Sequence, residues 1–487
     1  MPSSLATVFF VALIFVLLRR NSKCLPKHSW GLWVANIWIG IMISKPVSLW
    51  FQTDFGGDDV ESFLEGNPIE RGVLSFLICA GLFVLLRRRA NWSAVFRSYP
   101  AFVWLFYAFA IVSIVWSPFP FVSFKRVIRE LGAVVMILVI LTETDPLDAV
   151  RRVFVRCAVV LVPLSVLFIK YYPLIGRYTH RWNYRTMYAG VTTNKNALGL
   201  LAMVSALFLL WHMVESKQGR TRWQQFVSVA PEAAVLGMCL WILSIADSQT
   251  AYVCFVLGVV VFIAWRTSFA RLSVKATVAT ILIAGVCGGL VLTTPYLRGL
   301  VAGGVGRDES FTERTDIWAG ALALPTNPAI GAGFASVWLT PAGFALKQQI
   351  GGLAHSHNGY LETYLDGGAV GVLLLFFVLF AAAVQAARHS SAKTSARAFY
   401  VALVFVGLVY NFTEVTFNNG NALGLLLWLI AMSTPGLAFR REGAQVDRSP
   451  VRSKGTAAGR TNPVRPRAVI PANWARRHSP YARRFNG

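Results

Sequence analysis

The sequence predicts an all-α protein that crosses a membrane many times, and three observations support this fold class. Of the 487 residues, 55% are apolar and only 14% are charged, whereas soluble domains carry about 25% charged residues. Long apolar runs recur along the chain, and short basic clusters separate them. The runs are too long for the strands of a membrane barrel and lack two-residue alternation. This pattern excludes an ordinary cytosolic enzyme, a disulfide scaffold, a coiled coil and a disordered chain.

The apolar runs predict about 12 to 13 transmembrane helices, since one span needs roughly 20 mostly apolar residues. The candidate spans are 2–18, 29–51, 71–86, 100–116, 127–141, 153–169, 196–214, 227–246, 250–265, 274–294, 369–386, 398–413 and 420–436. The run 127–141 is the weakest of them. The first run has its positive charges after it, which indicates a retained span and not a cleaved signal peptide.

The net charge of +24 follows from the orientation of these spans. With the start of the chain outside and the segment after 436 inside, more than two thirds of the 46 Lys and Arg residues fall in connections on the inner side. Positive residues are enriched in cytoplasmic loops. The charge therefore predicts a multi-pass membrane protein and gives no reason to expect nucleic acid as a partner.

The chain divides into five predicted parts. They are N-terminal membrane helices at 1–99, central membrane helices at 100–294, a large outer loop at 295–358, C-terminal membrane helices at 359–436, and a disordered basic tail at 437–487. The tail is rich in Arg, Pro, Gly and Ser, a composition typical of disorder. Its charge fits either attraction to anionic lipid headgroups or a regulatory contact with a partner.

The outer loop at 170–195 breaks the charge rule. It contains no acidic residue, and tyrosines and a tryptophan lie between its basic residues, which are Lys170, Arg177, Arg181, Arg185 and Lys195. An interfacial aromatic belt with snorkelling cations is one interpretation. The alternative is an anion site for a membrane-embedded ligand, because arginine matches phosphate oxygens bidentately and aromatic rings suit sugars or polyprenyl chains.

The second long outer loop, 295–358, ends in a cluster of polar residues. His355 and His357 lie where the loop enters a helix, and histidine suits proton transfer near neutral pH. Asn358 can fix a ligand or cap this helix. Glu362 and Asp366 are four residues apart, so a polar stripe continues into the membrane, which is costly unless it faces a cavity. An interfacial histidine pair without chemistry is the alternative.

Other motifs give weaker signals. The His-x-His pair supplies two zinc ligands without a third at the usual spacing. No phosphate-binding loop, dinucleotide fingerprint, nucleophile elbow or zinc-protease motif is placed credibly. In the second loop, Thr312 is expected to cap a short helix and residues 331–333 to form a turn.

The spacing at the end of the second loop resembles a known family. His357-Asn358, nine further residues and then Gly368-Ala-Val-Gly371 resemble the H-N-x9-G-x-x-G signature of the O-antigen ligase and polysaccharide polymerase family. Arg314 with Trp318, followed by Asn327-Pro328 and Gly331-Ala-Gly333, resembles a further stretch of that family. The segment 190–199 resembles its exopolysaccharide branch, of the succinoglycan type. The resemblance covers roughly residues 100–435.

The resemblance implies a membrane glycosyltransferase that needs no metal or other cofactor. The donor would be a glycan on undecaprenyl diphosphate, and the acceptor either a second lipid-linked glycan, for a polymerase, or lipid A–core, for a ligase. Its active site would face the periplasm, and a chain-length regulator is a possible partner. The residues that would act in catalysis are His357 as the base, with Arg314 and Arg181 holding the diphosphate. Those that would bind substrate are Arg185, Arg177, His355, Asn358, Glu362 and Lys195.

Three classes of function compete for this sequence. The polymerase is preferred because of the segment 190–199, and the ligase is the runner-up. A flippase of lipid-linked sugars would predict paired repeats and charges near the middle of the bilayer, whereas the polar residues cluster at the outer face. A non-catalytic assembly protein would not require cations and histidines on two outer loops.

Overall fold

The computed structural model describes residues 1–23, 29–51, 67–88, 92–179, 184–216, 222–293, 312–350, 352, 355–389, 394–417 and 421–433. The expected tail at 437–487 and Arg181 lie outside these residues. The chain divides into the units Met1–Arg441 and Glu442–Gly487, and the fold described below is that of the first.

The described part of this unit is almost entirely helical, which confirms the predicted fold class. The first half contains α1 (Ser3–Lys23), α2 (Gly31–Ile43), α3 (Val47–Trp50), α5 (Pro68–Arg87), α6 (Trp92–Ser98), α7 (Ala101–Val112), η1 (Ser113–Trp116), α8 (Pro120–Leu141), α9 (Pro146–Tyr171), α10 (Pro173–Gly176), β1 (Arg177–Thr179), β2 (Thr186–Tyr188) and α11 (Lys195–Ser216). The second half contains α12 (Arg222–Ile245), α13 (Gln249–Arg266), α14 (Val274–Thr293), α16 (Thr312–Leu322), η2 (Val337–Leu339), α17 (Pro341–Gln349), α18 (Gly359–Arg388), α19 (Thr394–Tyr410) and α20 (Ala422–Met432).

Twelve of the thirteen predicted spans coincide with apolar helices in the described residues. Six of these helices are long enough to cross a membrane by themselves, and six are shorter, at 10–17 residues. The weakest candidate, 127–141, lies within α8, whose N-terminal half carries Lys125, Arg126, Arg129 and Glu130. The protein is therefore a multi-pass membrane protein.

Aromatic side chains join the central helices. Phe154 of α9 stacks on Phe208 of α11 with ring centroids 4.5 Å apart, and Trp211 of α11 stacks on Phe399 of α19 at 4.4 Å. All four side chains are almost completely buried. Lipid tails do not drive apolar side chains together, so tight packing of this kind holds membrane helices to one another.

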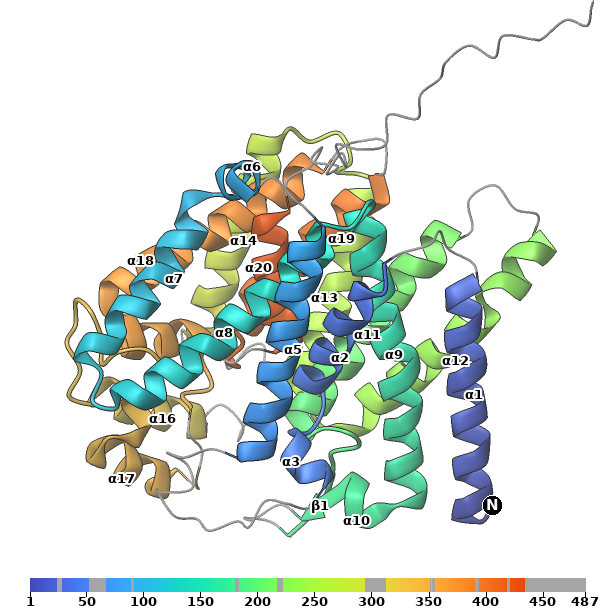
Figure 1. Cartoon of the computed structure of the whole chain (residues 1–487), viewed down its shortest axis with the longest axis horizontal. Coiled ribbons are helices and arrows are strands. Elements are labelled where there is room, and N and C mark those ends of the chain that lie inside the picture. Colours follow the sequence, from blue (N-terminus) through green and yellow to red (C-terminus); the bar gives the residue numbers. More distant parts are fainter. Residues whose placement is uncertain are drawn as a thin grey trace, which may run out of the picture. The chain divides into compact units, whose positions relative to one another are not determined.

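The two long outer loops lie at the same end of the helices. Figure 1 shows α10 and β1 of the first loop and α16 and α17 of the second loop towards the lower end of the view. β1 pairs antiparallel with β2, with Arg177 opposite Tyr188, and the two form a two-stranded sheet that follows α9 and α10 in the chain. This arrangement agrees with the prediction that both loops emerge on one side of the membrane.

Helix α18 contains a break that the second loop occupies. Gly368 has φ +59° and ψ −158°, and a Cβ at this position would lie 2.3 Å from the carbonyl carbon of Ala329. The backbone N–H groups of Ala369 and Val370 donate to the carbonyls of Pro328 and Ala329, at 2.9 and 3.0 Å. Glycine is needed here because its left-handed backbone and missing side chain allow this close approach.

The predicted turn at 331–333 completes this attachment. Gly331 and Gly333 both have positive φ, and the N–H of Gly333 donates to the carbonyl of Asp366 at 3.0 Å. Asn327 Oδ1 accepts hydrogen bonds from the next turn of the loop, at the N–H of Ala329 and Ile330. Gly331, Gly333 and Gly368 thus attach the second loop to α18. Thr312, which was expected to cap a short helix, is the first residue of α16.

Candidate active site

His357 directly precedes the N-cap of α18 and has an unusual backbone conformation. Its φ is +52°, which is rare for a residue other than glycine. Asn358 is the N-cap, since its Oδ1 accepts hydrogen bonds from the N–H of Tyr360 and Leu361 at 3.0 and 3.1 Å. Of the two roles considered for Asn358, the structure shows the helix cap. The cap fixes where the helix begins, and therefore where the imidazole of His357 lies.

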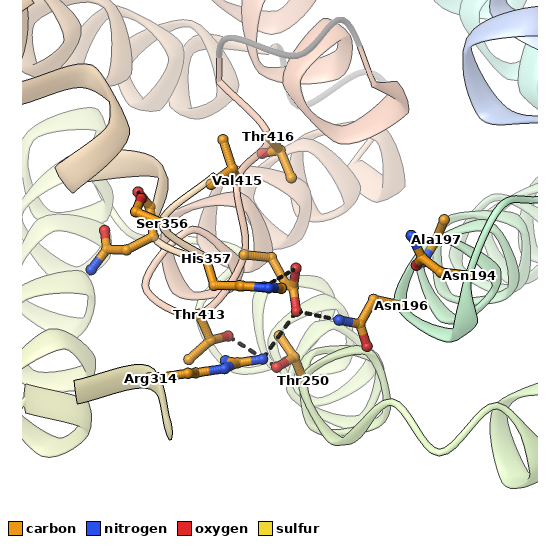
Figure 2. A network of polar contacts seen from close by, with 12 residues as sticks. Asn194, Asn196, Ala197, Thr250, Arg314, Ser356, His357, Thr413, Val415 and Thr416 are labelled. Atoms are coloured by element: carbon orange, nitrogen blue, oxygen red, sulfur yellow. Dashed lines mark hydrogen bonds and ion pairs between the residues drawn. The ribbon is translucent and has the colours of Figure 1, made fainter. Parts of the chain in front are cut away.

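The carboxylate of Glu414 lies beside His357 and binds three side chains. Its Oε2 is 3.3 Å from His357 Nδ1, and its Oε1 accepts from Arg314 Nη2 at 3.1 Å and from Asn196 Nδ2 at 2.8 Å. Figure 2 shows Arg314, His357 and Asn196 converging on this point from three different elements. Segments separated by more than a hundred residues therefore meet at one acidic group.

Backbone contacts hold Glu414 in place. It lies in the connection between α19 and α20, and the N–H of Gly359 donates to the carbonyls of Asn411 and Glu414 at 2.8 and 3.1 Å. A Cβ at position 359 would come within 2.2 Å of Asn411 Oδ1. Next to the carboxylate, the hydroxyls of Thr250 and Thr413 are 3.0 Å apart, which joins α13 to the same connection.

The charges around Glu414 decide its protonation state. Burial alone would raise the pKa of Glu414, but the hydrogen bond from His357 and the positive charges of His357 and Arg314 hold that pKa below its usual range. An ionised carboxylate next to Nδ1 favours the tautomer in which Nδ1 carries the proton. The lone pair of His357 is then on Nε2, where a general base would need it.

His355 packs against His357 and differs from it in its surroundings. The two ring centroids are 4.2 Å apart and the planes meet at 68°. Burial, together with the charge of His357, lowers the pKa of His355 to about 4, and its Nδ1 has no hydrogen-bond partner among the described residues. His355 is therefore a neutral imidazole at neutral pH.

Glu362 braces the loop that carries the histidines. Its carboxylate accepts hydrogen bonds from Trp338 Nε1 at 2.7 Å and from the N–H and hydroxyl of Ser356 at 2.9 and 2.8 Å. Trp318 Nε1 donates to the Ser356 carbonyl at 3.0 Å. These bonds fix Ser356 between the two histidines, and the substrate-binding role expected for Glu362 stays a prediction.

The described basic residues of the first loop differ in their surroundings. Arg177 Nε donates to the Ile169 carbonyl at 2.9 Å, and its guanidinium lies over the ring of Tyr188. Lys195 forms an ion pair with Asp247 at 3.2 Å, and Arg185 is exposed. Arg314 is the cation that the structure brings to His357, and the diphosphate roles of the first-loop residues remain predictions.

Two comparisons with known proteins bear on the resemblance to the O-antigen ligase family. Residues 233–376 match the family model described as O-antigen ligase. The chain is also 27% identical over 341 residues to the exopolysaccharide production protein ExoQ of Rhizobium meliloti (strain 1021), an alignment that covers 63% of this chain and 70% of the relative. The resemblance to the O-antigen ligase family is confirmed.

The stretch that matches the O-antigen ligase model contains only part of the site. Arg314, His357 and Gly368 fall within residues 233–376. Asn196 precedes this stretch and Glu414 follows it. Sequence reasoning missed Glu414, although a single carboxylate between two apolar runs was a usable signal because such a group is costly in a membrane. Asn196 lies within the segment 190–199, which supported the resemblance, but no role was predicted for this residue.

The site contains no obvious place for a metal ion. Within the residues that the structure describes, no three His, Cys, Asp or Glu side chains are grouped so that they could hold one. The groups present are instead a histidine, an arginine and a carboxylate, which are suited to moving a proton and to binding an anion.

Proposed function

We propose that the protein polymerises undecaprenyl-diphosphate-linked oligosaccharide repeat units into exopolysaccharide at the outer, periplasmic face of the inner membrane. The observation that supports this most directly is the Glu414 carboxylate, which orients His357 and Arg314 together. Glycosyl transfer from a lipid diphosphate needs a base for the incoming hydroxyl and a cation for the leaving group. One carboxylate would set the position of both.

In the proposed reaction, a hydroxyl oxygen of the acceptor sugar attacks the anomeric carbon of the donor. As that bond forms, the bond from the anomeric carbon to the diphosphate oxygen breaks, and undecaprenyl diphosphate leaves with the electron pair. The hydroxyl proton passes to Nε2 of His357. The ionised Glu414 beside Nδ1 stabilises the resulting imidazolium, because an opposite charge within hydrogen-bond distance favours the charged form.

Arg314 is the proposed cation for the departing diphosphate. Only its Nη2 is bonded to Glu414, so the remaining N–H groups of the guanidinium fork can bind phosphate oxygens. Further positive charge for the diphosphate is proposed to come from the first loop, from Arg181, Arg185, Arg177 and Lys195. Asn196 supports this arrangement, since it connects the end of the first loop to the carboxylate that also holds Arg314.

A polymerase is favoured over a ligase by the likeness to a protein of exopolysaccharide production. The O-antigen ligase description of the matching family model keeps transfer to lipid A–core as the second candidate. Both reactions use the same donor chemistry, so the site geometry is compatible with each. The two differ in which lipid-linked glycan accumulates when the enzyme fails.

The test is the profile of lipid-linked glycans in the native host. Asparagine is the best replacement for His357, because it tolerates a positive φ and removes the imidazole. His389 is the matched control, since it follows the opposite end of α18 and contacts Ser433 at 3.2 Å. Wild type, a deletion strain, His357→Asn and His389→Asn are compared by mass spectrometry and gel, at equal membrane levels.

Each outcome has a distinct meaning. If His357→Asn and the deletion both accumulate single repeat units and lose polymer, while His389→Asn resembles wild type, the polymerase is supported. If full-length chains accumulate on undecaprenyl diphosphate, the protein is a ligase. If His357→Asn makes normal polymer, His357 is not the base.

A further inference from the structure

Two arginines are buried in the first half of α9, the half that lies away from the first outer loop. Arg152 and Arg156 are one turn apart on the same face, and their exposed fractions are 3% and 6%. By the charge rule this is the cytoplasmic end of the helix. The proposed glycosyl transfer does not use either residue.

The hydrogen bonds of the two arginines are unequal. Arg152 Nη2 donates to Asp148 Oδ2 at 2.9 Å, and Arg151 binds the other oxygen of the same carboxylate. Within the described residues, Arg156 donates instead to a neutral group, from its Nη1 to Asn36 Oδ1 at 3.5 Å. The Nε atoms of Arg152 and Arg156 are buried without a hydrogen-bond partner among the described residues.

Among the residues that the structure describes, no hydrogen bond or ion pair joins Arg156 to an acidic group. Asp148 lies eight residues earlier, or about 12 Å along the helix axis. A guanidinium keeps its proton in proteins, so it cannot become neutral as a buried lysine would. A buried charge without a partner is strongly destabilising, and an anion from outside the chain would remove that penalty.

The surroundings of Arg156 indicate where such an anion would come from. Its guanidinium carbon is 4.3 Å from the ring centre of Trp33 on α2, and Trp33 is 43% exposed. Trp33 is the third residue of α2, and tryptophan at the end of a membrane helix marks the headgroup level of the bilayer. Basic pockets between membrane helices on the cytoplasmic side bind lipid headgroups.

We infer that a phosphate group binds between α2 and α9, where Arg156 and Arg152 provide the charge and Trp33 borders the site. An anionic phospholipid headgroup is the expected carrier, and free phosphate shares the same chemistry. Arginine suits this ligand because its planar fork matches two phosphate oxygens. The site is independent of the reaction at Glu414, so it would exist even if the proposed function were wrong.

The test compares the thermal stability of the full chain in two kinds of nanodisc. One contains only phosphatidylcholine, and the other contains phosphatidylcholine with phosphatidylglycerol. Arg156→Gln is the variant. Arg87→Gln is the matched control. Arg87, the last residue of α5, also lies over an aromatic ring, that of Phe83 at 5.0 Å, but it is exposed.

The expected result is a crossover. In phosphatidylcholine alone, Arg156→Gln should be at least as stable as wild type, because it removes an unpaired buried charge. With phosphatidylglycerol, wild type should gain a higher Tm, Arg156→Gln should lose most of that gain, and Arg87→Gln should keep it. Native mass spectrometry should show about fivefold to tenfold weaker retention of phosphatidylglycerol by Arg156→Gln, since each such arginine contributes about that factor.

Two results would overturn the inference. If Arg156→Gln lowers Tm equally in both nanodiscs, the arginine has a structural role only. If Arg87→Gln loses the lipid effect to the same extent, the effect is general surface attraction. Inorganic phosphate added to the phosphatidylcholine nanodiscs distinguishes free phosphate from a lipid headgroup. A gain in Tm for wild type but not for Arg156→Gln would indicate a soluble phosphate ligand. No gain would leave the lipid as the carrier of the phosphate.

Discussion

Asn196→Ala removes one hydrogen bond from the Glu414 carboxylate and leaves the fold of α11 intact. The bond is 2.8 Å long and joins a neutral amide to a charged acceptor, a kind of bond that contributes about 1.5–3 kcal/mol. If about 2 kcal/mol of this is needed to keep Glu414 against His357 and Arg314 in the transition state, kcat/KM falls about thirtyfold.

The same variant should change the pH dependence of the reaction. A hydrogen bond to a carboxylate favours its charged form, so losing it raises the pKa of Glu414. Protonation of Glu414 then begins at a higher pH. The steeper part of the acid limb of the kcat/KM profile, where Glu414 is protonated as well as the base, therefore moves upward in pH. The other titratable groups facing Glu414 are His357, His355, Arg314 and Tyr410, and all are unchanged in this variant.

Asn194→Ala is the matched control, two residues earlier in the same segment. Its Oδ1 caps α11 by accepting from the N–H of Ala197 at 2.9 Å and does not contact Glu414. Loss of a cap costs about 1 kcal/mol of stability, without an effect on turnover per folded molecule. The assay uses the full chain in vesicles with lipid-linked repeat units, over a range of pH.

The reasoning would be refuted by either of two results. Asn196→Ala could retain full activity with an unchanged acid limb, which would mean that the hydrogen bond does not position Glu414. Alternatively, Asn194→Ala could lose as much activity per folded molecule as Asn196→Ala, which would indicate a general disturbance of the first loop.

Three further predictions follow from the same contacts. Glu414→Gln should lower kcat/KM at least about a hundredfold while the protein still inserts, because a buried charge partner is worth about 3–5 kcal/mol; near-normal turnover in vesicles would contradict this. His355 takes up a proton near pH 6.5 when unfolded but only near pH 4 when folded, so stability falls as the pH drops through this range, by up to about 1.4 kcal/mol per unit; His355→Phe should reduce the difference in Tm between pH 7.5 and 5, and an unchanged difference would count against the low pKa. Gly368→Ala should lower Tm or abolish folding, because its Cβ would lie 2.3 Å from the backbone of Ala329. Gly72→Ala in α5 is the control and should be neutral or stabilising, because a Cβ there has nothing within 4 Å. Equal effects of the two variants would exclude the close approach at Gly368 as the cause.

The sequence was sufficient to predict the helices and the position of His357, because both depend on local patterns. An apolar run of about 20 residues has few alternatives to a membrane helix. The spacing from His357 to Gly368 and Gly371 is also local, and in the structure it sets the distance between the helix cap and the break that receives the second loop.

The partners of His357 could not be predicted in the same way. Glu414 comes 57 residues later, and its position depends on the packing of α19 and α20 and on the hydrogen bonds of Gly359. The charges of Arg177 and Lys195 were visible in the sequence. Their contacts with Ile169 and Asp247 are tertiary, so a count of positive charges could not reveal them.

The order of the site along the chain has a consequence for biogenesis. Asn196, Arg314 and His357 all precede Glu414 in synthesis, so a nascent chain presents the cation and the imidazole before their counter-charge exists. That carboxylate comes with the connection between α19 and α20, the last two helices among the described residues. Under the proposed mechanism, the site is therefore complete only once this connection is in place, and a chain stopped before residue 414 would be inactive.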